Sequence, residues 1–213
     1  MGDALISFLR QLRDGYVNRK MIPFPKSIAL VGMLDVRDYK AQIRPDGQSL
    51  GQISPFNIIR KDMLIPNFTE SDISTLYAQH TAETGQRFAN GVVADVWRLT
   101  CGQPWLVNAI GCECVEEIHG NRHDETITVE DVDAAKEAII RRNPVHLDYL
   151  FYMANLPQIK PLVEAGLHGS LTEEQHKGPH FKVLRGLGLF YDVNGTLEFA
   201  NPLYAEYWEK MMS

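Results

Sequence analysis

Helical signals dominate this 213-residue chain from residue 70 onward and leave little sequence for a sheet. Thr69 with Asp72 three residues later, and Thr128 further along, are placed as the N-caps of helices. Strand-like stretches precede this region only at 28–33 and 56–60, and two strands cannot form a parallel sheet that is covered on both faces. The chain is therefore expected to be mainly α. Its helices are predicted at 70–83, 88–99, 104–118, 129–141, 145–154 and 157–167.

Both ends of the chain carry recognisable patterns. Residues 3–20 form an amphipathic helix in this interpretation, because Leu5, Phe8 and Leu12 recur at helical spacing. Near the other end, Asn194-Gly195 separates two alternating stretches and predicts a hairpin with a type I′ turn. A last helix follows the hairpin. Helices, then a two-stranded wing, then a helix are the order of elements in a winged helix.

Charge indicates protein rather than nucleic acid as the partner. The net charge is −6, and residues 145–213 carry five basic against eight acidic side chains. The wing turn at 192–198 has no basic residue to meet a phosphate, although phosphate contacts supply most non-specific affinity for nucleic acid. A DNA-binding regulator is the alternative, because Lys177, Lys182 and Arg185 would fall within one recognition helix.

Other bulk features indicate a cytoplasmic protein that does not enter a membrane. Three cysteines are too few for a disulfide framework, no apolar run approaches about 20 residues, and no signal-peptide pattern opens the chain.

Metal and nucleophile chemistry find little support in the sequence. Cys112 and Cys114 would point away from each other on a helix, so buried structural cysteines are the favoured interpretation. His176 and His180 have the spacing of helical zinc ligands, but Gly178-Pro179 interrupts that helix. No G-x-S-x-G elbow is present for a serine nucleophile. We therefore predict no metal and no catalytic residue.

Several stretches resemble, in order and spacing, the AAA-like, STAND-related bacterial ATPases of the P-loop class. They are "DALISFLRQLRDGY", "SIALVGMLDVRDYK", "SPFNI", "NFTESDISTLYAQHTAETGQ" and "LTCGQPWLVNAI". The resemblance runs over nearly the whole chain and is strongest between residues 3 and 118. It implies three parts: a remnant of the α/β nucleotide-binding core with its sensor strand (1–66), a helical lid (67–143) and a winged helix (144–213).

The resemblance also implies the candidate cofactor-binding residues. Asp35 and Arg37 follow the sensor strand, and Gly102-Gln103-Pro104 resembles the Gly-x-Pro turn whose proline packs near adenine. Each set has a plainer alternative. Asp35 and Arg37 would be a surface ion pair of little energetic value. Pro104 would start a helix at its usual first position, with Trp105 as a buried anchor.

The chain departs from the family in its catalytic motifs. It contains no G-x-x-x-x-G-K-[ST], no apolar strand ending in Asp-Glu, and Leu34 where members often carry arginine. ATP and magnesium serve the intact family, but none is expected to bind this chain alone, which would begin just after the acidic strand. The resemblance thus implies a lid and winged-helix part that transmits nucleotide state and binds protein without being catalytically competent. The uncovered strand edges at 27–60 also predict self-association.

Overall fold

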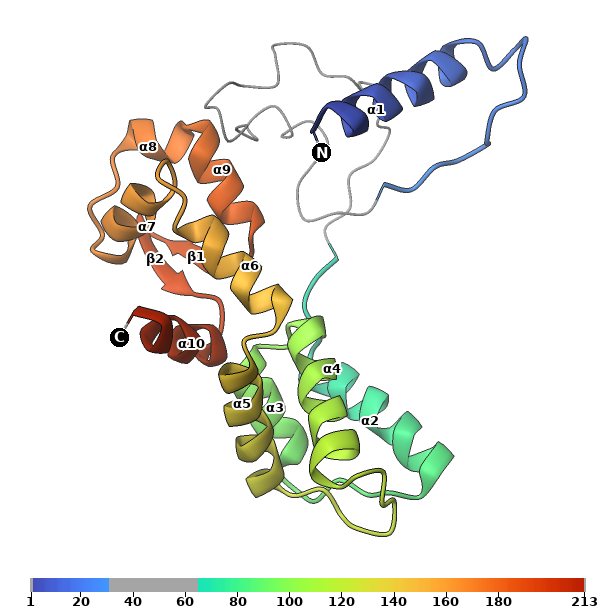
Figure 1. The fold of residues 1–213 in the computed structure, drawn as a ribbon, viewed down its shortest axis with the longest axis vertical. Coiled ribbons are helices and arrows are strands. Elements are labelled where there is room, and N and C mark those ends of the chain that lie inside the picture. Colours follow the sequence, from blue (N-terminus) through green and yellow to red (C-terminus); the bar gives the residue numbers. More distant parts are fainter. Residues whose placement is uncertain (1, 31–64, 213) are drawn as a thin grey trace. The chain divides into compact units, whose positions relative to one another are not determined.

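The computed structural model describes residues 2–30 and 65–212, and within them the chain is mainly α (Figure 1). The helices are α1 (Gly2–Val17), α2 (Glu70–Thr84), α3 (Val92–Thr100), α4 (Pro104–Cys112), α5 (Val129–Arg142), α6 (Val145–Ala154), α7 (Lys160–Leu167), α8 (Glu173–Lys177), α9 (Pro179–Gly186) and α10 (Pro202–Met212). A π-helical segment, η2 (Glu113–Ile118), continues α4, and strands β1 (Phe190–Val193) and β2 (Thr196–Phe199) pair with each other. None of the helices in these ranges is long and apolar enough to cross a membrane.

Local capping signals confirm where two of the predicted helices begin. Thr69 caps α2, and Asp72 completes the capping box by accepting from the Thr69 backbone N–H at 2.8 Å. Thr128 and Asp131 form the same box at the start of α5. In each case a side chain satisfies amides that the first turn leaves unpaired, and the acidic residue lies at the positive end of the helix dipole.

The helix predicted at 104–118 changes character partway along its length. It is α-helical as far as Cys112 and π-helical from Glu113 to Ile118. Such wider turns are rare and are found often at functional sites. Periodicity alone does not reveal them, because one extra residue in a turn shifts the pattern only slightly.

The structure divides into two compact units. The first, named here the bundle unit, comprises Ile65–Leu156, Leu189–Tyr191 and the chain from Glu198. Within it, α3 contacts α2, α4, α5 and α10. Helices α2, α3, α4 and α5 lie together in Figure 1. Its core includes Val96, Leu106, Ile110 and Val132, none of which has measurable exposure. Burial of such side chains stabilises the unit by about 1.5–3 kcal/mol each.

The second unit contains Pro157–Gly188 and Asp192–Leu197, together with the described N-terminal residues 2–30. In this unit Gly166 of α7 lies so close to Leu197 of β2 that an added Cβ would come within 2.4 Å of the leucine side chain. The predicted hairpin is confirmed, with positive φ at both Asn194 (54°) and Gly195 (90°) as a type I′ turn requires.

Several predicted features fall outside the described residues. These are Asp35, Arg37, the strand at 56–60 and most of the strand at 28–33, of which residues 28–30 are described and are not assigned to a strand. The predicted domain boundaries at 66/67 and 143/144 remain predictions.

Candidate functional site

Gly102, Gln103 and Pro104 lie together in the tight turn that joins α3 to α4. Cys101 and Gly102 both have positive φ, 46° and 72°, which reverses the chain immediately after α3. The Thr100 hydroxyl accepts from the Gly102 N–H at 3.1 Å, and the Thr100 carbonyl accepts from the Gln103 N–H at 3.0 Å. These bonds fix the turn from the side of α3.

The segment that leads into α2 holds the same turn from the other side. The Phe68 N–H donates to the Gly102 carbonyl at 2.8 Å, and the Asn67 side chain donates to the Cys101 carbonyl at 3.1 Å. Gly102 approaches Phe68 so closely that no side chain fits there, because a Cβ would lie 1.8 Å from the Phe68 carbonyl oxygen. The start of the helical bundle and the Gly-x-Pro turn therefore form one rigid connection.

The N-terminus of α4 is largely closed to anions. Pro104 has no N–H, the Leu106 N–H donates to the Gln103 side chain at 2.7 Å, and the Val107 N–H donates to the Gln103 carbonyl at 3.0 Å. Only the Trp105 N–H is left in the first turn, whereas a phosphate site uses several such donors. The turn therefore suits an uncharged contact better than a phosphate.

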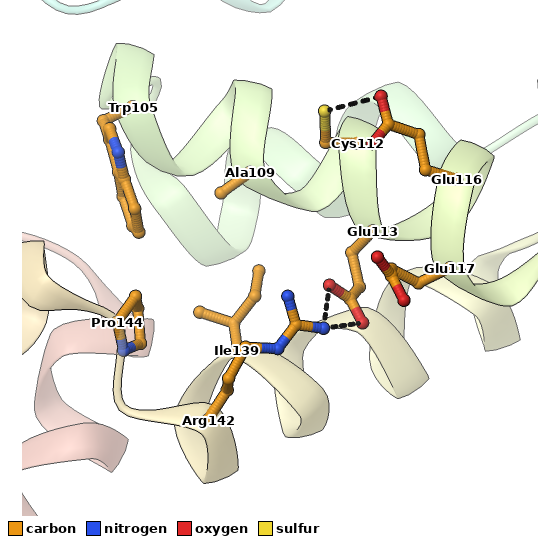
Figure 2. Close-up of a pocket in the computed structure, with 9 residues that line it drawn as sticks. All are labelled: Trp105, Ala109, Cys112, Glu113, Glu116, Glu117, Ile139, Arg142 and Pro144. Atoms are coloured by element: carbon orange, nitrogen blue, oxygen red, sulfur yellow. Dashed lines mark hydrogen bonds and ion pairs between the residues drawn. The ribbon is translucent and has the colours of Figure 1, made fainter.

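Trp105 is not the buried anchor of the plainer alternative. Its side chain is 36% exposed, although one side of the ring packs 4.5 Å from the ring of His146. Figure 2 shows Trp105 at one end of a hollow between α4–η2 and α5, with Ile139 pointing into it. The hollow has a volume of about 170 Å³. Sequence periodicity did not predict this hollow, because its walls come from separate elements, α4, η2 and α5. How these elements pack also decides how far Trp105 is covered.

An ion pair between the buried carboxylate of Glu113 and the exposed side chain of Arg142 closes the far end of the hollow. Glu113 is only 5% exposed, and Nη2 of Arg142 lies 2.7 Å from both of its carboxylate oxygens (Figure 2). The two residues come from η2 and the end of α5, 29 positions apart in sequence. A charge-assisted contact of this kind compensates a carboxylate that has lost its water.

Removing the cation of this pair should destabilise the bundle unit. We expect Arg142→Gln to lower the free energy of unfolding by about 1–2 kcal/mol, because the buried Glu113 carboxylate loses its charged donor. Arg141→Gln on the same last turn is the matched control, since Arg141 is exposed and makes no ion pair within the described residues; its effect should stay within about 0.5 kcal/mol. Urea unfolding followed by tryptophan fluorescence compares them. Equal losses in the two variants would contradict a role for the pair.

The cysteines are poorly suited to metal binding or nucleophilic attack. Burial raises the pKa of Cys114 to about 12, and nearby Asp131 and Glu113 add to the effect. Burial, followed by the hydrogen bond to Glu116, also raises the pKa of Cys112. Protonated thiols are weak ligands and weak nucleophiles. The expectation of buried cysteines holds for Cys114 but is wrong for Cys112, which is exposed because it lies at the rim of the hollow.

Among the described residues, no group of three or more His, Cys, Asp or Glu side chains is arranged to hold a metal ion. His119 instead lies between two carboxylates, with Nδ1 at 2.9 Å from Glu125 and Nε2 at 3.0 Å from Asp131. The hydrogen bond to Asp131 raises the pKa of His119; burial opposes the shift, and the bond to Glu125 adds to it. This arrangement links the residue that follows η2 to the first turn of α5.

Comparison with known proteins does not assign the chain to a family. No family model, no curated protein and no solved structure matches this chain. The functional interpretation therefore depends on the residues themselves and on the resemblance of the quoted stretches.

Proposed function

We propose that this chain is the lid and winged-helix part of an AAA-like ATPase, and that it transmits nucleotide state to a protein partner without hydrolysing ATP by itself. The observation that carries the proposal is the rigid connection between residues 67–68 and the turn at 101–104. A base that contacts Pro104 and displaces the turn would also displace the segment that leads into α2, because two hydrogen bonds and a close backbone contact join the two segments.

The chemistry of the turn supports a transmitting rather than a catalytic role. Gln103 accepts from the Leu106 and Val107 amides and only the Trp105 N–H is left in the first turn of α4, so phosphates would gain little from this helix. The sequence also contains no P-loop motif that would supply such a cradle. Adenine recognition without a phosphate site provides little free energy for binding a nucleotide.

The hairpin region supports protein rather than DNA as the partner. Asp192 accepts from the Gly195 N–H at 3.0 Å and lies 3.6 Å from the His176 ring, so an acidic residue occupies the turn that would contact a phosphate backbone. A wing that reads DNA usually offers cations at this place.

Calorimetry tests the nucleotide part of the proposal. ATP or ADP titrated with magnesium into this chain should give no detectable heat, because the phosphates find no cradle. Micromolar binding would contradict the proposal, and Pro104→Ala, a mild change at the first position of α4, would then show whether the turn at 101–104 makes the site. Binding of duplex DNA at low salt that weakens as salt rises would instead favour the DNA-binding regulator.

A further inference from the structure

The hollow beside Trp105 combines an apolar wall with excess negative charge. Trp105, Ile139 and Pro144 line one end, and the carboxylates lie toward the other (Figure 2). Its volume of about 170 Å³ is well below the roughly 300–1,000 Å³ of pockets that bind small molecules. That space fits one long side chain and is too small for a nucleotide.

The lining contains three glutamates and one arginine, and only one of the glutamates is paired with the arginine. Glu113 is held by Arg142, and Glu116 accepts a long hydrogen bond of 3.5 Å from Cys112. Glu117 is exposed and has no hydrogen bond or ion pair within the described part of the chain. An anion would therefore be repelled here. Of the two glutamates that have no cation partner in the described part of the chain, Glu117 is the one that also makes no hydrogen bond there.

The aromatic wall is also free to receive a cation. His146 packs on the Trp105 ring but does not line the hollow, and burial lowers the pKa of His146, so its ring is neutral at pH 7. A tryptophan face attracts guanidinium and ammonium groups, and the flat guanidinium also stacks on it. Long basic side chains bury their stems against apolar surface while the charged end stays near water.

We propose that this hollow binds an arginine side chain of a partner protein. Its stem packs against Ile139, its guanidinium stacks on the face of Trp105, and the unpaired carboxylate of Glu117 attracts its charge. This inference goes beyond the proposed function and does not depend on it, because no nucleotide takes part. It specifies the chemistry of the partner: a segment with an exposed arginine.

The test uses small probes on the whole chain, observed by NMR. N-acetyl-arginine amide should shift the Trp105 side-chain N–H and the Ile139 methyl signals, whereas the neutral isostere N-acetyl-citrulline amide should bind at least about threefold more weakly. Raising the salt concentration should weaken the arginine response, since an exposed charge pair is screened.

Variants of exposed glutamates identify the site. Glu117→Gln should weaken the arginine probe about threefold, and Glu117→Lys should abolish the response. Glu83→Gln, an exposed glutamate on α2 in the same unit, should leave the response unchanged. The proposal is overturned if citrulline binds as well as arginine, if Glu117→Gln binds like the natural chain, if a lysine probe binds more tightly than arginine, or if no shift occurs. None of these results bears on nucleotide binding, so failure here leaves the proposed function to its own test.

Discussion

The variant Gly102→Ala should lower the free energy of unfolding of the bundle unit by about 3–4 kcal/mol. Gly102 has φ of +72°, a conformation that L side chains rarely adopt. The added Cβ would also lie 1.8 Å from the Phe68 carbonyl oxygen and 2.8 Å from its carbonyl carbon. Both neighbours are backbone atoms that cannot rotate away. The hydrogen bond from the Phe68 N–H to the Gly102 carbonyl would therefore be lost.

Gly85→Ala provides the matched control for this prediction. Gly85 has a similar φ of +83°, but nothing lies within 4 Å of the position its Cβ would take. It should cost only the conformational strain, about 1 kcal/mol. Tryptophan fluorescence during urea unfolding is a suitable measurement, because Trp97, Trp105 and Trp208 all lie in the bundle unit. Equal costs for the two variants would mean that residues 67–68 are not held against the turn.

Features of the fold that depend on neighbouring residues were predictable from the sequence. The capping boxes at Thr69 and Thr128 each use a partner three positions away, and the Asn194-Gly195 turn is set by two adjacent residues. Such signals act through local backbone geometry, so a sequence pattern contains all their parts. The mainly α fold follows from the same kind of evidence.

Features that depend on distant segments were not predictable. Gly102 was singled out as part of a Gly-x-Pro motif, but its contact with Phe68 joins positions 34 residues apart. Glu113 and Arg142 are similarly remote, and nothing in either local stretch identifies the other as its partner. Trp105 was a buried anchor only in the plainer alternative for the turn, in which Pro104 simply starts a helix, and its actual exposure of 36% depends on which elements cover it. The roles of Asp35 and Arg37 stay predictions.

His119 should give the bundle unit a stability that depends on pH. Its side chain is 9% exposed, and both ring nitrogens face carboxylates, so the doubly protonated imidazolium donates to Glu125 and Asp131 at once. Its pKa is raised, first by the hydrogen bond to Asp131. We expect His119→Gln to lower the free energy of unfolding by about 2 kcal/mol near pH 6. The pair with Glu125 contributes only a small part of this, because Glu125 is 44% exposed and solvent screens its charge.

The sign of the pH dependence follows from the direction of the shift. Below about pH 6.5 both the folded and the unfolded chain hold the proton, and the contribution of His119 is fully present. As pH rises further, the unfolded chain loses the proton while the folded chain keeps it, and the contribution falls until pH passes the folded-state pKa. The stability difference between the natural chain and His119→Gln should therefore shrink as pH rises above about 6.5, until pH passes the raised folded-state pKa of His119.

Asp131 should make the stability of the bundle unit fall at acidic pH. Its pKa is lowered overall, although burial pushes it upward, because hydrogen bonds from His119 and Thr128 favour the carboxylate. Its contribution is present above its unfolded-state pKa of about 3.9 and is lost as pH falls through the lower folded-state pKa.

The matched control for His119→Gln is His168→Gln. His168 is an exposed histidine in the other unit, and this variant should change stability by less than about 0.5 kcal/mol at every pH. A stability difference for His119→Gln that stays constant or grows as pH rises above about 6.5 would mean that folding does not raise the pKa of His119, and that its contacts with the two carboxylates do not favour the imidazolium.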